Sequence, residues 1–303
     1  MSKVTEQAAV LALTRVTAGP WHHTARVIQT ARGALRLVDG DLTGLSGDDR
    51  AHAAEIVSRL RRDDLAHAED LIAATRADGA HLITVLDEEY PGNLDFVHNL
   101  PPFLWIRGRL TDEDHRSVAV IGDDRSGGPA AGLLKHDITA LAEAGFTPVA
   151  GLCSGVDSAV HGAALAAGGR TIAPLAHGVT APITPGENAT VAAEIARGGA
   201  LVSPFWPSAP ATEAAVALSR IVISGLAAAV YLVGGEEGSG PASQARLALA
   251  QGRHLFVTHR LHREQPWVRR AAYRGGVTVV RDIDDLLAQM VNLVDVTLNV
   301  KLF

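Results

Sequence analysis

Residues 145–169, GFTPVAGLCSGVDSAVHGAALAAGG, join an apolar segment to an alanine-rich one through a turn that carries glycines. The run Phe146–Ala150 predicts a short buried strand, and the alanines after the turn predict a helix. Glycine lets a backbone approach a ligand closely, and a helix start offers free N–H groups. The stretch therefore predicts either a phosphate-type site of α/β proteins or a purely structural turn. Its candidate contact residues are Gly151, Ser154, Gly155, Asp157 and His161.

Apolar runs of strand length recur after residue 116, and alanine-rich segments of helical length separate most of them. Continuous apolar strands joined by helices are typical of a parallel sheet that is covered on both faces. Right-handed crossovers then give an α/β, doubly wound, mostly parallel sheet. The runs lie at 117–121, 146–150, 171–176, 200–202, 228–233, 254–258 and 277–280.

Residues 1–78 predict a small helical module. Apolar residues recur at helical spacing in 4–16 and 24–31, and 49–77 predicts one long charged helix that stops at Gly79.

Residues 79–116 predict an extended linker and the edge of the sheet. The pairs Tyr90-Pro91 and Pro101-Pro102 exclude a regular helix, and 103–106 predicts an edge strand. The core of the fold is expected at 117–291, with a terminal helix at 282–291. Residues 292–303 are expected to form a tail, whose alternating sequence suits a strand, an oligomer contact or a loose end.

The composition limits the function classes. A net charge of −6 over 303 residues argues against a globally basic nucleic-acid binder, so any phosphate binding must come from a local patch. The single cysteine, Cys153, excludes an intrachain disulfide and fits a reducing cytoplasm. A signal peptide and a membrane-spanning segment are not expected. We therefore expect a cytoplasmic protein without a membrane partner.

Catalytic chemistry is weakly represented. Asp157 and His161 are spaced to share one helix face, which favours a hydrogen-bonded pair at the helix start over an acid–base dyad. Ser154 does not stand in a GxSxG elbow, and no histidine pair is spaced to complete a metal site. The expectation is that the protein is not an enzyme and has no metal or cofactor.

Two further segments are candidates for phosphate contact. The first predicted strand of the core continues as VAVIGDDRSGG (118–128), in which Gly122 and Arg125 are the candidates, although Asp123 and Asp124 disfavour an anion. The stretch 246–281 holds eight arginines and interleaves two aromatic residues with them, as a nucleic-acid groove requires. A solvated turn and a solvated charged face are the alternatives. The candidates in the second segment are Arg263, Arg269, Arg270 and Arg274.

Several blocks together resemble the DprA/Smf family of DNA-processing proteins, in the family's order and spacing over about residues 80–285. They are YPGNLDFVHNLPPFLWIRG, VAVIG, VAGLCSGVDSAVHGAALAAGGRTIAPLAHG, LSRIVISGLAAAVYLVG and GSGPASQARLALAQGRHLFV. The resemblance implies a Rossmann-like core that binds single-stranded DNA, helps to load the recombinase RecA and protects DNA during transformation. It also implies a SAM-like or helix-hairpin-helix module at residues 1–78, and a homodimer without established catalysis.

The chain departs from the family pattern at polar contact positions. The family's G-S-R turn is Gly122-Asp123-Asp124 with Arg125 displaced by one, and only Arg220 remains of its F-P-x-R-N-R block. Ser239 and Gly240 persist, but the threonine that follows them in the family is Gln244. His161 keeps the position of the family's histidine. Because each lost arginine removes a phosphate contact, we expect weak binding of single-stranded DNA.

Two functions therefore remain open from the sequence. The first is a DprA-like protein that binds single-stranded DNA and assists DNA processing, natural transformation or recombination. The alternative is a Rossmann-like protein that binds a nucleotide or another small ligand and has lost DNA binding.

Overall fold

Parallel strands form the centre of the computed structural model, which describes residues 5–123, 129–153, 155–183 and 186–300. The strand order is β6-β5-β4-β3-β7-β8-β9, so the chain runs outward from β3 to β6 and then returns to β7 on the other side of β3. All seven apolar runs form strands, and the doubly wound α/β sheet is confirmed. The strands are β3 (Ser117–Ile121), β4 (Thr147–Val149), β5 (Ile172–Pro174), β6 (Ala200–Ser203), β7 (Ala229–Leu232), β8 (His254–Thr258) and β9 (Val277–Val280).

An antiparallel hairpin extends the sheet beyond β6. Strand β2 (Phe103–Gly108) pairs with β6, and β1 (His81–Thr84) pairs with the far side of β2. The run 103–106 was expected at the edge, but it lies inside the sheet and β1 forms the edge. Phe103 and Trp105 join one hydrophobic cluster and Leu104 and Ile106 another, so β2 contributes to the core on both of its faces.

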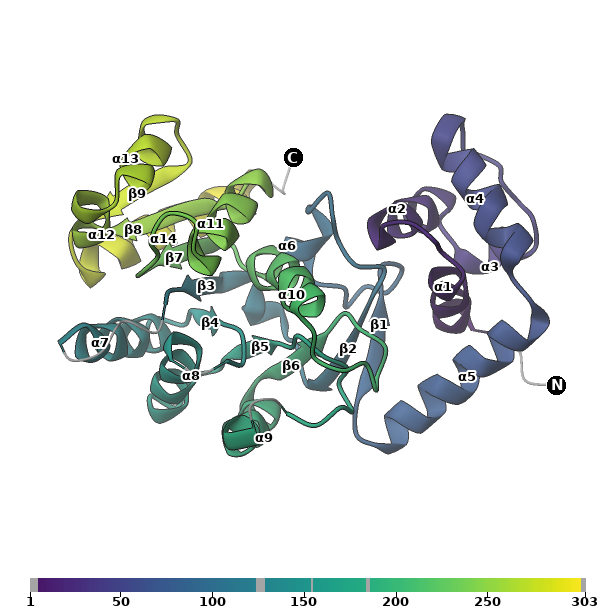
Figure 1. Ribbon diagram of the computed structural model, residues 1–303, viewed down its shortest axis with the longest axis horizontal. Helices are drawn as coiled ribbons and strands as arrows, with labels where there is room; N and C mark the ends of the chain where they lie inside the picture. The colour runs from purple at the N-terminus through teal and green to yellow at the C-terminus, as the bar shows by residue number, and fades with distance from the viewer. Residues whose placement is uncertain (1–4, 124–128, 154, 184–185, 301–303) are drawn as a thin grey trace.

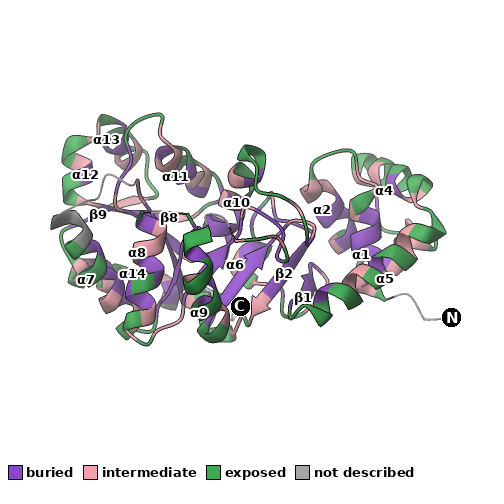
Figure 2. Cartoon of the chain, turned by 60° about the horizontal axis from the view of Figure 1, so that its bottom comes forward, coloured by how far each residue is buried: buried purple, intermediate pink, exposed green. Residues whose placement is uncertain are grey.

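Helices cover both faces of the sheet (Figure 1). Helices α10 (Glu213–Leu226) and α11 (Gly240–Ala250) pack on one face through residues such as Val222 and Ala242. The other face carries α7 (Pro129–Glu143), α8 (Val156–Ala166), α9 (Ala189–Gly198) and α14 (Ile283–Val300). Buried residues accordingly concentrate in the strands and on the inward sides of the helices (Figure 2).

Helix α14 corrects the expectation for the end of the chain. Leu286, Met290 and Val294 are buried at a spacing of four residues and join the core formed with α7. Ala288 and Asn292, which a strand would place on the same face as these residues, are exposed, so the burial pattern is that of a helix. Residues 292–300 therefore continue the helix, where the sequence predicted a tail.

Five helices precede the sheet: α1 (Glu6–Arg15), α2 (Trp21–Ala31), α3 (Ala34–Val38), α4 (Gly47–Arg59) and α5 (Arg62–Ala77). They lie at one end of the molecule, beyond β1 (Figure 1). The single helix predicted over 49–77 is two, because Leu60 and Arg61 have extended backbones and Asp64 caps the second helix by accepting from the N–H of Arg61. The domain boundaries that the sequence predicts after residues 78 and 116 stay predictions.

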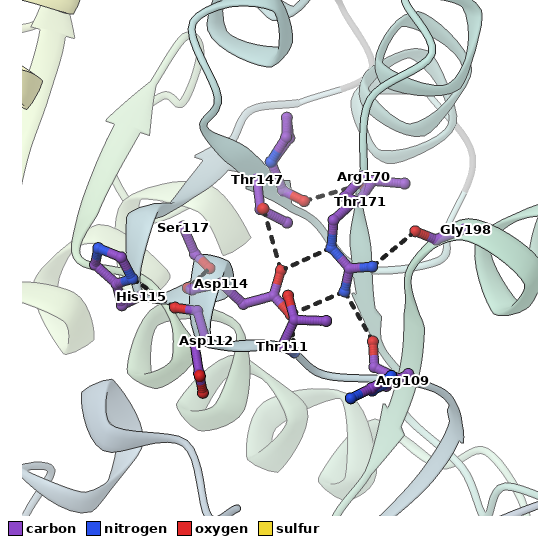
Figure 3. Close-up of polar contacts among 11 residues, drawn as sticks. Arg109, Thr111, Asp112, Asp114, His115, Ser117, Thr147, Arg170, Thr171 and Gly198 are labelled. Carbon is purple, nitrogen blue, oxygen red and sulfur yellow. Dashed lines mark hydrogen bonds and ion pairs between the residues drawn. The ribbon is translucent and has the colours of Figure 1, made fainter.

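A buried ion pair ties the hairpin to the amino ends of the parallel strands (Figure 3). Asp114, in the turn η1 (Asp112–Arg116), accepts from Arg170 at 2.9 and 3.2 Å and from the hydroxyl of Thr147 at 3.1 Å. Arg170 also donates to the carbonyls of Arg109 and Gly198. This network fixes the backbone that leads into β3. It lies at the amino ends of the strands and does not involve their carboxyl ends.

Candidate nucleic-acid interface

The switch point of the sheet lies between β3 and β7, where successive connections leave in opposite directions. In doubly wound folds, ligands bind in the crevice outside the carboxyl ends of the strands at such a point. The turns after β3, β4 and β7 all lie at this edge. Among the described candidates, Gly122, Gly151, Gly155 and Ser239 lie in these turns, and Asp157 and Gly240 begin the helices that follow.

Gly122 and Gly234 allow two of these turns to pack directly against each other. A Cβ on Gly122 would lie 2.8 Å from Cγ2 of Val233 and 3.0 Å from Cγ2 of Val156. A Cβ on Gly234 would lie 3.0 Å from Oδ1 of Asp123. A Cβ at either position would therefore force a neighbouring side chain to shift, and the carboxylate of Asp123 stands at the switch point.

The turn after β4 is stabilised by its own carboxylate. Oδ2 of Asp157 accepts from the backbone N–H of Cys153 at 3.1 Å, and a Cβ on Gly151 would meet the same oxygen at 2.6 Å. Gly155 has a φ of +75°, a conformation that favours glycine, and precedes α8. Asp157 thus occupies part of the space in which a phosphate would meet this turn. Arg125 and Ser154 lie outside the described residues.

The sequence indicated His161 as a contact residue, but its side chain is fully buried. Its Nε2 lies 2.8 Å from the carbonyl of Gly151 and its Nδ1 lies 2.8 Å from Oγ1 of Thr171. Burial lowers the pKa of His161 to about 4, so the ring is neutral near pH 7 and Nε2 carries the proton that the carbonyl accepts. Both ring nitrogens are engaged away from Asp157, so His161 holds the turn against β5 and does not contact a nucleic acid directly.

Arg220 lies across the start of α11. A Cβ on Gly240 would be 2.8 Å from Nη2 of Arg220, and Ser239 caps the helix by accepting from the N–H of Ala242. A guanidinium and a helix N-terminus together create positive potential at the switch point. The structure therefore brings Arg220, Ser239 and Gly240 together, with Oγ of Ser239 3.5 Å from a Cβ built on Gly235. The distance between Arg220 and Gly240 along the chain gave no direct sign of this contact.

The side chain of Gln244 is buried on the same helix, one turn beyond Gly240. Within the described part of the chain, its Nε2 has no hydrogen-bond partner. Sequence reasoning treated this residue only as a departure from a family pattern.

The arginine-rich stretch 246–281 runs from the end of α11 to β9 and includes α12 (His259–Glu264) and α13 (Pro266–Tyr273). Helix α13 contacts the turn after β7 through Trp267 and Arg270. Trp267 is 4% exposed and donates from Nε1 to the carbonyl of Gly235 at 3.1 Å, so it anchors α13 and offers no stacking surface. Tyr273 is 94% exposed and remains available. The predicted alternation of arginines with aromatic residues therefore places one of its two aromatics on the surface.

The arginines of this segment have different environments. Arg269 donates to the carbonyls of His262 and Arg263 at the end of α12, and Arg270 lies 2.5 Å from Oε1 of Glu237. Arg263 and Arg274 are exposed. The Arg270–Glu237 pair places the basic segment directly beside the switch-point turns, which themselves carry carboxylates.

The described residues contain no cluster of three histidine, cysteine, aspartate or glutamate side chains that would hold a metal ion. In the same described ranges, no helix combines the length and apolarity needed to span a bilayer.

Comparison with known proteins identifies related chains. The model of the family described as DNA recombination-mediator protein A matches residues 81–291. The DNA processing protein DprA of Bacillus subtilis is 30% identical over 183 residues, which are 60% of this chain and 61% of that protein. Protein Smf of Escherichia coli is 34% identical over 178 residues, 58% of this chain and 47% of that protein. The matches thus span about half to three fifths of these relatives.

Solved structures show the same fold. The X-ray structure of DprA from Streptococcus pneumoniae superposes with a TM-score of 0.73 at 22% identity, covering 95% of this chain and 98% of that one. A structure of DprA from Helicobacter pylori, described in terms of its single-stranded DNA binding mode, gives a TM-score of 0.60 at 24% identity. It covers 70% of this chain and 96% of the other.

Proposed function

The chain belongs to the DNA recombination-mediator protein A family, and on this basis we propose that it binds single-stranded DNA along the carboxyl edge of its sheet. The observation that carries the proposal is the guanidinium of Arg220 over the start of α11, at the switch point between β3 and β7. Relatives named for DNA processing and a similar fold described with a single-stranded DNA binding mode support it.

The proposed path starts at the turns of Gly122, Gly151 and Gly155 and crosses Arg220. It continues over the arginine-rich helices α12 and α13. Such a path combines backbone phosphate contacts with a limited stacking surface, of which Tyr273 is the exposed aromatic. Outside these two turns, the contact residues proposed along the path are Arg220, Ser239, Gly240, Arg263, Arg269, Arg270 and Arg274, and Arg125 and Ser154 are proposed from the sequence alone.

Binding is expected to be weak and dependent on salt. Asp123 stands at the switch point, Asp157 closes its own turn and Glu237 pairs with Arg270, so each of these carboxylates opposes or competes with a phosphate.

The test is fluorescence anisotropy of a labelled dT oligonucleotide at low and at physiological salt. Arg220→Gln should weaken binding and lower the slope of log affinity against log salt by about 0.7, the value for one phosphate contact on a single strand. Arg197→Gln is the matched control, because Arg197 is exposed at the far end of α9 and pairs with Glu194. If the unmodified protein binds the oligonucleotide at neither salt concentration, the proposed function is refuted.

Further parts of the proposal follow from family membership. We propose that the protein forms a homodimer, delivers single-stranded DNA to RecA and catalyses no reaction itself. Light scattering of the purified chain tests the first point, and a pull-down with purified RecA tests the second. A monomer at micromolar concentration, or RecA that is not retained, would contradict the respective part.

A further inference from the structure

A cavity of about 1000 Å³ lies between α11 and α13, on the face of the sheet that α10 and α11 cover. It extends from Glu237, in the turn after β7, to Arg253, immediately before β8. Both helices lie at the same end of the molecule (Figure 1). The volume is that of a site for a small molecule.

Arg253 contributes a partly buried positive charge to this cavity. Its Nη2 donates to the carbonyls of Asn93 and Gly225, and its Nε is buried without a partner among the described residues. Burial lowers the pKa of Arg253 to about 10, which still leaves it cationic near pH 7. Carbonyl dipoles alone therefore compensate this guanidinium within the described structure, and an anion in the cavity would complete its environment.

The remaining charges on the cavity wall are also mainly positive. Arg246 and Arg274 are exposed and line it, whereas the carboxylate of Glu237 is paired with Arg270 at 2.5 Å. A concave site with charge of one sign concentrates ligands of the opposite sign. Guanidinium groups bind phosphate oxygens through paired, charge-assisted hydrogen bonds.

The cavity also offers flat apolar surface. Phe96 follows the short helix α6 (Gly92–Asp95) and is 70% exposed although it lines the cavity. Leu249 and Trp267 form part of the inner wall, and the guanidinium of Arg246 lies 5.7 Å from the centroid of the Trp267 ring. An exposed aromatic side chain beside several guanidinium groups suits a planar heterocycle that carries phosphate.

We propose that this cavity binds a nucleoside phosphate. Arg246, Arg253 and Arg274 hold the phosphate groups, and Phe96 stacks on the base. The cavity reaches the turn after β7 at Glu237 and otherwise lies along α11 and α13, so the inference goes beyond DNA binding at the carboxyl edge. Arg270 and Arg274 border both sites, whereas Arg246 and Phe96 belong to the cavity and Arg263 belongs only to the proposed DNA path.

The experiment is isothermal titration calorimetry of the full chain with ATP, GTP, CTP and UTP singly, and with inorganic pyrophosphate and adenosine. At least one nucleotide should bind once per chain, about tenfold or more tightly than pyrophosphate or adenosine, because phosphate and base contacts then act together. No saturable nucleotide binding, or pyrophosphate binding as tight as that of every nucleotide, would overturn the proposal.

Variants separate this site from the DNA path. Arg246→Gln and Phe96→Ala should each weaken nucleotide binding by about fivefold or more and leave the dT oligonucleotide affinity unchanged. Arg263→Gln should weaken binding of the dT oligonucleotide and leave nucleotide binding unchanged. If the oligonucleotide displaces the nucleotide and Arg246→Gln weakens both equally, the cavity is part of the DNA path and the proposal fails. Loss of oligonucleotide binding alone would refute only the DNA function.

Discussion

Replacement of Asp114 by asparagine should destabilise the protein through the loss of the charge and of one hydrogen-bond acceptor, because the two side chains have nearly the same shape. Asp114 is 8% exposed and accepts two bonds from Arg170, one from the hydroxyl of Thr147 and one from the N–H of Thr111 (Figure 3). The amide oxygen of asparagine can still accept from Thr111. Its NH2 group cannot accept from Arg170, whose guanidinium then loses its carboxylate partner.

The size of the effect follows from the burial of the two partners. Removing one member of a fully buried ion pair costs about 3–5 kcal/mol. The Arg170 side chain is 26% exposed and keeps its bonds to the carbonyls of Arg109 and Gly198, so water and these carbonyls offset part of the loss. We therefore expect Asp114→Asn to lower the free energy of unfolding by about 2–3 kcal/mol.

Equilibrium urea denaturation followed by tryptophan fluorescence measures this change. The control is Glu55→Gln, which removes a carboxylate that pairs with Arg59 at 2.6 Å with both side chains about half exposed. It should alter the free energy of unfolding by no more than about 0.5 kcal/mol. A loss below about 1 kcal/mol for Asp114→Asn, or an equal loss for both variants, would refute the role given to the buried pair.

Three further predictions concern groups placed by the fold. Burial lowers the pKa of His161 to about 4, so its contribution to stability is complete above pH 6.5 and is lost as the pH falls through 4. When the pH is lowered from 7 to 5, the free energy of unfolding of the unmodified protein, measured by urea denaturation, should fall by about 2 kcal/mol more than that of His161→Gln. Equal losses for the two proteins would contradict this. Burial raises the pKa of Asp137, so its contribution is present below pH 3.8 and is lost as the pH rises through the raised value. Asp137→Asn can still accept from Tyr231, so it should raise the free energy of unfolding by up to about 1 kcal/mol at pH 7 and leave it unchanged at pH 3. A lower free energy of unfolding at pH 7 would contradict the destabilising role given to the Asp137 charge. Asp123→Ser removes a carboxylate from the switch point and should strengthen binding of the dT oligonucleotide roughly threefold to tenfold at low salt and less at high salt. Fluorescence anisotropy measures this change, and an affinity equal to that of the unmodified protein would contradict the prediction.

The parallel strands were predictable because a strand buried on both faces must be apolar at every position. The position of β2 was not, because Trp105 pairs with Ser203 across a long stretch of chain, and no local pattern specifies such a partner. The break between α4 and α5 lacks proline and glycine. Its usable signal is the pair Asp63 and Asp64, since carboxylates in a first helical turn favour a new helix start.

The candidate site was predictable in its turns and less so in its side chains. Glycines at 122 and 151 indicated close backbone approach, and a Cβ at either position would force a neighbouring side chain to shift. His161 and Trp267 could not be assigned from residue type, because each is as compatible with a surface contact as with the buried hydrogen bond that it makes. Burial depends on which elements meet, and the fold alone determines that.

The central position of β3 also affects synthesis of the protein. Val118 pairs with Ala229, so one side of β3 lacks its partner until about a hundred more residues have left the ribosome. At about 5–20 residues per second, this interval lasts roughly 5 to 20 seconds. During it, an apolar strand with unpaired backbone groups is open to association with other nascent chains. Newly made chains are therefore most vulnerable to aggregation before β7 emerges, and a synonymous recoding that slows translation between β6 and β7 should lower the soluble yield.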